Sequence, residues 1–137
     1  MFDANADVSQ HDLDRLRAEY ADRERRLAGS DIYSLFNPAH LFMTQQRQRV
    51  TLRTLRRLGF YPLDQRRILE VGCGRGGVLL EYLSYGAAPA RIHGIDLLGD
   101  RVAEARARMP SLSFSCADGQ HLPYPDGVFD LVLQYTA

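Results

Sequence analysis

Apolar and polar positions alternate with two different periods along the chain. Residues 11–28 carry apolar side chains at helical spacing, with charged residues between them, and Gly29 ends this segment. A second helix is predicted over residues 38–58, because Asn37 is a good N-cap and Pro38 suits the first helical position. The first part of the chain is therefore predicted to be helical.

Short β-rich runs begin at Arg66 and alternate with helical segments. We predict helices over 77–85 and 100–109, and strands over 67–71, 91–96, 112–117 and 128–134. Alternating strands and helices favour an α/β fold with a parallel sheet. Right-handed crossovers would bring the carboxyl ends of all four strands to one rim of that sheet.

Composition indicates a single ordinary globular domain. The 137 residues are 45% hydrophobic and 25% charged, and 17 basic residues balance 17 acidic ones. Without a net charge, nothing favours nucleic acid or an anionic membrane as a partner. A local basic band does occur over residues 31–67, and every basic residue in the chain is Arg, which we interpret as base-composition bias in a GC-rich bacterium.

The sequence also favours a cytoplasmic protein without a bound metal. It has no run of about eighteen apolar residues, and residues 1–7 have neither the basic flank nor the apolar core of a secretion signal. Cys73 and Cys116 are too far apart for metal-type spacing, and two free thiols suit a reducing compartment.

The stretch E-V-G-C-G-R-G-G, residues 70–77, fits two cofactor templates. The pattern G-x-G-x-x-G, typical of dinucleotide sites, uses Gly72, Gly74 and Gly77. The pattern E-x-G-x-G-x-G, typical of S-adenosylmethionine sites, uses Glu70, Gly72, Gly74 and Gly76, with Cys73 inside the loop. Either loop would present backbone amides to an anionic group, which is a pyrophosphate in one case and a methionine carboxylate in the other.

Acidic residues near the strand ends bear on this choice. Glu70 would repel a pyrophosphate but attract the ammonium and sulfonium of S-adenosylmethionine, unless it faces solvent or an Arg. Asp96 lies about twenty residues past the glycines and suits an acceptor of ribose hydroxyls, which both cofactors have. Leu97 follows it and is a candidate to flank an adenine ring.

Two further strand ends supply candidate cofactor contacts. Asp118 follows the third strand and is placed to accept the adenine amino group, although a turn or capping role would also explain it. Gly119 would allow close approach of the backbone. Gln134 and Tyr135 follow the fourth strand, near the point where a transferred group would emerge.

Three motifs together carry a resemblance to a known family. I-L-E-V-G-C-G-R-G-G, G-I-D-L-L-G-D-R-V and A-D-G-Q-H-L-P-Y-P-D-G-V-F-D-L-V-L resemble the successive motifs of class I S-adenosylmethionine-dependent methyltransferases of the type 11 branch. The resemblance implies a Rossmann-like doubly wound sheet with strand order 3-2-1-4. It also implies that residues 1–60 form an N-terminal helical cap and 61–137 the first part of the cofactor-binding domain.

The resemblance further implies methyl transfer from S-adenosylmethionine to a small-molecule acceptor. Glu70 and the glycines would line the methionine part, Asp96 the ribose and Asp118 the adenine, and no residue is indicated as catalytic. Two other functions stay open: a non-catalytic S-adenosylmethionine-binding or interaction module, and an NAD-dependent oxidoreductase.

The family's sheet has seven strands, whereas four are predicted here. An apolar edge strand such as residues 128–134 is prone to pair with another chain. We therefore predict that this chain is a fragment of a longer protein, or that its fourth strand pairs with a second copy in a homo-oligomer.

Overall fold

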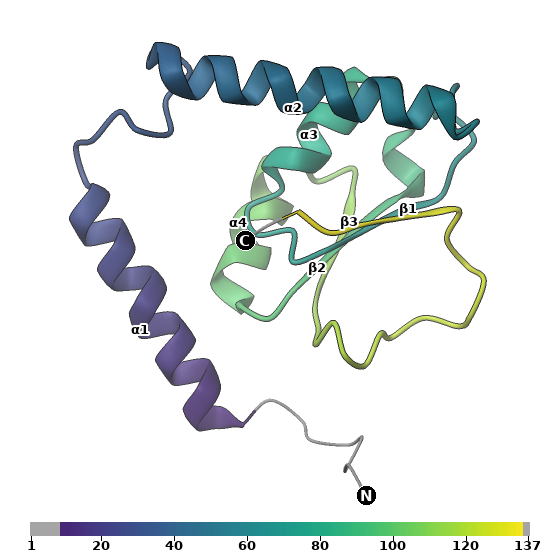
Figure 1. Ribbon diagram of the computed structural model, residues 1–137. Coiled ribbons are helices and arrows are strands. Elements are labelled where there is room, and N and C mark those ends of the chain that lie inside the picture. Colours follow the sequence, from purple (N-terminus) through teal and green to yellow (C-terminus); the bar gives the residue numbers. More distant parts are fainter. Residues whose placement is uncertain (1–8, 136–137) are drawn as a thin grey trace, which may run out of the picture. The chain divides into compact units, whose positions relative to one another are not determined.

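The computed structural model describes residues 9–135, which fall into two compact units (Figure 1). The first unit, Gln10–Tyr61, contains the helices α1 (Gln10–Leu27) and α2 (Pro38–Arg57). The Asn37 side chain accepts hydrogen bonds from the backbone N–H groups of Ala39 and His40, at 3.0 and 3.3 Å. The two helices that the apolar spacing predicts are thus confirmed, and the N-cap of the second is Asn37.

The second unit begins at Pro62 and contains the sheet. Its strands are β1 (Ile68–Val71), β2 (Ile92–Asp96), β3 (Ser113–Cys116) and β4 (Leu131–Leu133). Its helices are α3 (Gly77–Ser84), the short 3-10 helix η1 (Pro89–Arg91) and α4 (Gly99–Arg108). The sequence predicted all of these elements except η1.

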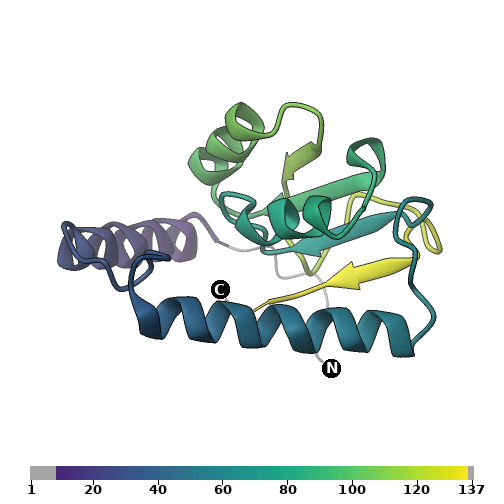
Figure 2. The ribbon, with the colours of Figure 1, turned by 90° about the horizontal axis from the view of Figure 1, so that it is seen from above.

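All strand pairs in the sheet are parallel, and the order is β3-β2-β1-β4. The predicted order 3-2-1-4 is therefore confirmed. Glu70 on β1 lies opposite Gly94 on β2 and Leu133 on β4, so these three residues share one face of the sheet. Helices α3 and α4 lie on one side of the sheet (Figure 2).

The core lies between the sheet and these helices. Ile68 and Ile92 on this side of the sheet and Leu79 on α3 are fully buried there, and Leu69 and Ile95 are fully buried on the opposite face. On the other face of the sheet, the loop before β4 brings the rings of Tyr124 and Phe129 against His93, with ring centroids 5.8 and 5.3 Å away. This aromatic cluster covers β2 on the side away from α3.

Strand β4 is shorter than the predicted range 128–134. Gly127 adopts a φ of +74°, which ends the preceding turn, and Phe129 packs against His93 instead of joining the sheet. The Asp130 carboxylate accepts a hydrogen bond from the Arg67 backbone N–H at 2.7 Å. Asp130 therefore joins the beginnings of β1 and β4, and regular pairing starts only at Leu131.

Candidate functional site

The carboxyl ends of the four strands meet at one rim of the sheet, as the sequence predicts. Gly72 follows β1, Asp96 ends β2, Asp118 follows β3 and Gln134 follows β4. Because neighbouring strands are parallel and in register, these positions lie along the same edge. In open parallel sheets, ligands bind outside this edge.

The glycine loop between β1 and α3 is held by β2. The backbone N–H groups of Gly72 and Cys73 both donate to the Ile95 carbonyl at 2.9 Å, and the Gly74 N–H donates to Asp96 Oδ2 at 2.9 Å. Gly72, Gly74 and Gly76 have φ values of +74°, +54° and +82°. Side chains at these three positions would be strained, which explains the glycines.

Two of these glycines have different surroundings. A Cβ atom at Gly72 would meet nothing within 4 Å, so this backbone faces open space. At Gly76 it would collide with the Met109 methyl group and lie 3.3 Å from the Phe114 ring. Gly72 therefore leaves space for a ligand, whereas Gly76 allows α3 to begin close against the core.

Asp96 orders the loops on both sides of it. Its Oδ2 accepts from Gly74, and its Oδ1 accepts from the Leu98 N–H at 2.9 Å. Each oxygen retains a second lone pair, which is the acceptor capacity that a ribose hydroxyl would use. The sequence did not predict that Asp96 also fixes the glycine loop and the start of α4.

Glu70 is almost completely buried, with 2% of its surface exposed. It is the penultimate residue of β1, two positions before Gly72, and its side chain lies on the same face as Gly94 and Leu133. The solvent-facing interpretation left open by the sequence is therefore wrong. A buried carboxylate next to the loop favours a cationic ligand group and disfavours an anionic one.

Asp118 has the turn role considered from the sequence and also keeps one carboxylate oxygen without a hydrogen bond among residues 9–135. Its Oδ1 accepts from the Gln120 N–H at 2.9 Å, and its carbonyl accepts from the His121 N–H at 3.0 Å, as in a turn. Its Oδ2 is buried, has no hydrogen-bond partner among residues 9–135 and lies 3.9 Å from His121 Nδ1. A buried acceptor without a hydrogen bond is energetically costly, and an adenine amino group would satisfy it.

The other candidates differ in what they expose to the rim. The Cys73 thiol is buried, and burial, followed by the charges of Asp96 and Glu70, raises its pKa to about 12. Cys73 therefore presents no reactive sulfur, and its backbone N–H is already bonded to the Ile95 carbonyl. A Cβ atom at Gly119 would lie 2.8 Å from Val71 Cγ1, so this glycine is needed for packing as well. Leu97 is half-buried and Gln134 is exposed.

Three contacts near the rim were not predicted from the sequence. Arg75 forms an ion pair with Glu104, and its carbonyl accepts from Arg108 Nη1 at 3.3 Å, which ties the glycine loop to α4. The hydroxyl groups of Tyr82 and Tyr135 lie 3.1 Å apart. The position of Tyr82 within an apolar helix is a signal of burial, but its partner is 53 residues away and is not predictable from spacing.

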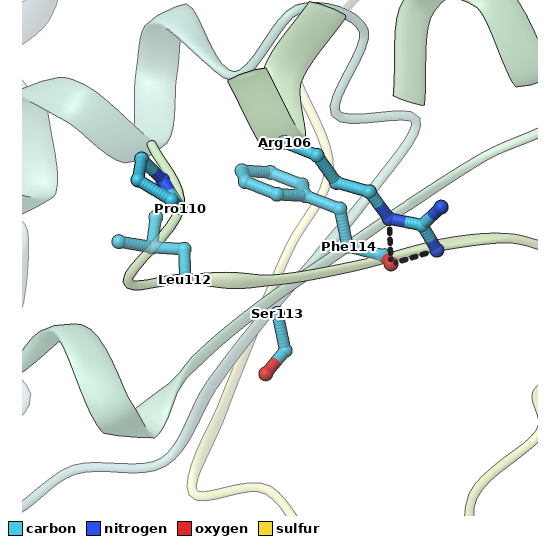
Figure 3. A pocket seen from close by; sticks show the side chains of 5 residues that line it. All are labelled: Arg106, Pro110, Leu112, Ser113 and Phe114. Atoms are coloured by element: carbon cyan, nitrogen blue, oxygen red, sulfur yellow. Dashed lines mark hydrogen bonds between the residues drawn. The ribbon is translucent and has the colours of Figure 1, made fainter. Parts of the chain in front are cut away.

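A surface pocket of about 430 Å³ lies elsewhere, at the start of β3 (Figure 3). Its lining residues are Arg106, Pro110, Leu112, Ser113 and Phe114, none of which is a candidate cofactor residue. The Arg106 guanidinium donates to the Phe114 carbonyl at 2.8 and 3.1 Å (Figure 3). Arg106 thus satisfies a carbonyl of an edge strand at the amino end of the sheet.

No cluster of His, Cys, Asp or Glu suited to a metal ion occurs within residues 9–135. Among the same residues, no helix is both long and apolar enough to cross a membrane.

A parallel 3-2-1-4 sheet with a glycine loop after β1 and acids at the next two strand ends defines an α/β domain that binds a nucleoside cofactor. The family model described as "methyltransferase domain" matches residues 68–137, which are 70 of the 137 residues. The chain therefore belongs to this family of class I methyltransferases, whose cofactor is S-adenosylmethionine. The family match favours the second loop template over the dinucleotide one.

Similar proteins include two curated methyltransferases. The chain is 39% identical over 77 residues to phthiotriol/phenolphthiotriol dimycocerosates methyltransferase 1 of Mycobacterium ulcerans, covering 55% of this chain and 28% of the relative. It is 42% identical over 73 residues to the fatty-acid O-methyltransferase of Mycolicibacterium smegmatis, covering 52% and 26%. The match thus spans only about a quarter of each relative's length.

A solved structure supports the fold. The YcgJ protein from Bacillus subtilis superimposes with a TM-score of 0.53 at 20% sequence identity, covering 66% of this chain and 37% of that one.

Proposed function

We propose that this chain forms the cofactor-binding part of an S-adenosylmethionine-dependent methyltransferase that acts on a small-molecule acceptor. The observation that carries the proposal is the buried Glu70 carboxylate, two residues before an open Gly72 at the ligand-binding rim. Such a site favours a cofactor that carries positive charge next to its amino-acid part. Family membership supports the same cofactor.

The residues at the rim fit the parts of this cofactor. We assign the methionine part to Glu70, the backbone of Cys73 and the loop glycines, and the ribose to the remaining lone pairs of Asp96. The adenine would lie by Leu97 and Gly119, with its amino group on Asp118 Oδ2, while Gln134 would face the methyl end.

The bound cofactor supplies a methyl group on a good leaving group. The contribution of this chain is to hold that group in one orientation and to exclude water, so that an acceptor can approach in line. We assign no catalytic base. Burial lowers the pKa of His93, which packs against Tyr124 and Phe129 on the other side of the sheet, and His121 faces Asp118.

For the acceptor we propose a lipid that is methylated on oxygen. This class rests on the names of the two relatives, one of which is a fatty-acid O-methyltransferase. The match covers only 28% and 26% of these relatives' lengths, so methyl transfer by the whole protein is itself part of the proposal. A chain that binds the cofactor but transfers no methyl group would be the binding module considered from the sequence.

Equilibrium dialysis with methyl-labelled S-adenosylmethionine tests the charge argument. Glu70→Gln removes the negative charge at nearly constant volume, and we expect it to weaken binding by about tenfold or more, since hydrogen bonds and contacts to charged groups are worth roughly 1.5–3 kcal/mol. The matched control is Glu19→Gln, on the exposed surface of α1, which should bind as the parent does. Equal affinity of Glu70→Gln and the parent would refute the proposed role of Glu70.

A further inference from the structure

A pair of tyrosine hydroxyls connects helix α3 to the end of β4. Tyr82, in the last turn of α3, is 1% exposed, and its hydroxyl oxygen lies 3.1 Å from that of Tyr135. Tyr135 follows β4 by two residues and is half-buried. The contact joins two segments that are 53 residues apart in the sequence.

The register of β1 and β4 directs Tyr135 towards the start of the glycine loop. Strands β1 and β4 are parallel, with Glu70 opposite Leu133. Tyr135 is two residues past Leu133, just as Gly72 is two residues past Glu70, so an extension of this register would bring Tyr135 alongside Gly72. Because its hydroxyl meets that of Tyr82 on α3, the Tyr135 side chain points to the α3 side of the sheet, which is also the side of Glu70.

The surroundings of Tyr82 keep this hydroxyl pair intact. Burial raises the pKa of Tyr82, and the hydrogen bond to Tyr135 and the nearby charge of Glu70 raise it further. Tyr82 therefore retains its proton throughout the physiological pH range and can always donate or accept. Its burial also prevents Tyr82 from touching a ligand at the rim.

We propose that Tyr82 is a positioning residue, which holds Tyr135 in place as the wall of the cofactor site on the β4 side of Gly72. The inference rests on the proposed function, since it assigns a wall to that same site. In this arrangement Tyr135 borders the open space at Gly72, while Tyr82 acts on the cofactor only through Tyr135. Glu70, Tyr82 and Tyr135 thus form one unit that spans β1, α3 and the end of β4.

Calorimetric titration of the 137-residue chain with S-adenosylhomocysteine tests this role. The variants are Tyr82→Phe, Tyr135→Phe and the double variant, each of which keeps the ring and removes a hydroxyl. The control is Tyr124→Phe, which loses a hydroxyl bonded to Ser115 in the cluster on the other side of the sheet. Unfolding midpoints are measured for all four, and titrations are performed well below them.

We expect each single variant to weaken S-adenosylhomocysteine by about three- to tenfold, the usual range for one neutral hydrogen bond. The affinity of the double variant should be no lower than that of the weaker-binding single variant, because each single substitution already removes the contact between the two hydroxyls. Two results would overturn this inference and leave the proposed function standing. One is a lower unfolding midpoint with unchanged affinity in Tyr82→Phe, and the other is a loss of affinity in Tyr124→Phe as large as that in Tyr82→Phe. Absence of binding by the parent chain would overturn the proposed function, and this inference with it.

Discussion

Asp96 Oδ2 accepts a hydrogen bond from the Gly74 backbone N–H at 2.9 Å, so the acid that ends β2 holds the loop that follows β1. The same carboxylate fixes the start of α4 through Leu98. A residue expected only to contact ribose therefore also shapes the loop that would hold the methionine part. If the expected ribose contact adds to these observed hydrogen bonds, a change at Asp96 has a measurable consequence.

Asp96→Asn should weaken S-adenosylhomocysteine by about ten- to a hundredfold in a calorimetric titration. The amide oxygen can still accept one of the two hydrogen bonds, from Gly74 or from Leu98, but the NH2 group cannot accept the other. Each lost hydrogen bond to a charged acceptor is worth roughly 1.5–3 kcal/mol. Asp100→Asn, at an exposed position in the first turn of α4, is the control and should bind normally. Normal binding by both variants would show that Asp96 does not contribute.

Gly72→Ala and Gly76→Ala should separate binding from folding. Both positions have positive φ, so each alanine costs about 1 kcal/mol or more in strain. Gly76→Ala also collides with Met109, so we expect the larger loss of unfolding free energy in urea. Gly72→Ala should retain more stability but lose cofactor affinity, because its methyl group enters the open space. The reverse ranking in stability would contradict the packing described here.

Asp118→Ala should remove discrimination at the adenine amino group. The parent chain should bind S-adenosylhomocysteine at least about fivefold more tightly than S-inosylhomocysteine, which lacks that amino donor to the buried Oδ2. In the variant the two affinities should be nearly equal. If the parent shows no preference, or the variant keeps it, the adenine lies elsewhere.

The two thiols should differ sharply in reactivity towards a disulfide reagent at pH 8. Cys116 is exposed and should react quickly, whereas Cys73 is buried with a pKa raised to about 12. The thiolate is the reactive form, and at pH 8 only about one Cys73 in ten thousand would carry it. We expect one thiol to react quickly in the native chain and none in the native Cys116→Ser variant. In the parent chain unfolded by urea, both thiols should react quickly. A fast thiol in native Cys116→Ser would contradict the burial of Cys73.

The same raised pKa predicts how stability changes with pH. An unfolded thiol ionises near 9.0, while folded Cys73 ionises near 12. Its contribution is therefore complete below pH 9 and is lost as the pH rises towards 12, because the unfolded state releases its proton first. Unfolding free energy measured in urea from pH 7 to 10 should fall above pH 9. Cys73→Ser should show a shallower fall, and an identical slope would contradict this assignment.

Local patterns predicted the fold because each element has its own signal. Alternating β-rich and helical runs gave the parallel sheet, and Asn37 with Pro38 gave the start of α2. Exact limits were less predictable: residues 128–130 look like strand, yet Asp130 bonds to Arg67 and Phe129 packs on His93. These are contacts between distant segments, which a local pattern does not contain.

The candidate site was predictable in its position but only partly in its contacts. Strand-end acids and glycines identify the rim, since parallel strands must bring their carboxyl ends together. The double role of Asp96, the burial of Glu70 and the Tyr82–Tyr135 contact depend on packing between elements. The cap role of residues 1–60, the individual cofactor contacts, pairing with a second copy and the cytoplasmic location stay predictions.

Titration of the parent chain with S-adenosylhomocysteine and, separately, with NADH tests the central claim most directly. Buried Glu70 and open Gly72 should favour the thioether-linked amino acid and reject a pyrophosphate. We therefore expect saturable heat of binding with S-adenosylhomocysteine and none with NADH. Binding of NADH without binding of S-adenosylhomocysteine would contradict the claim.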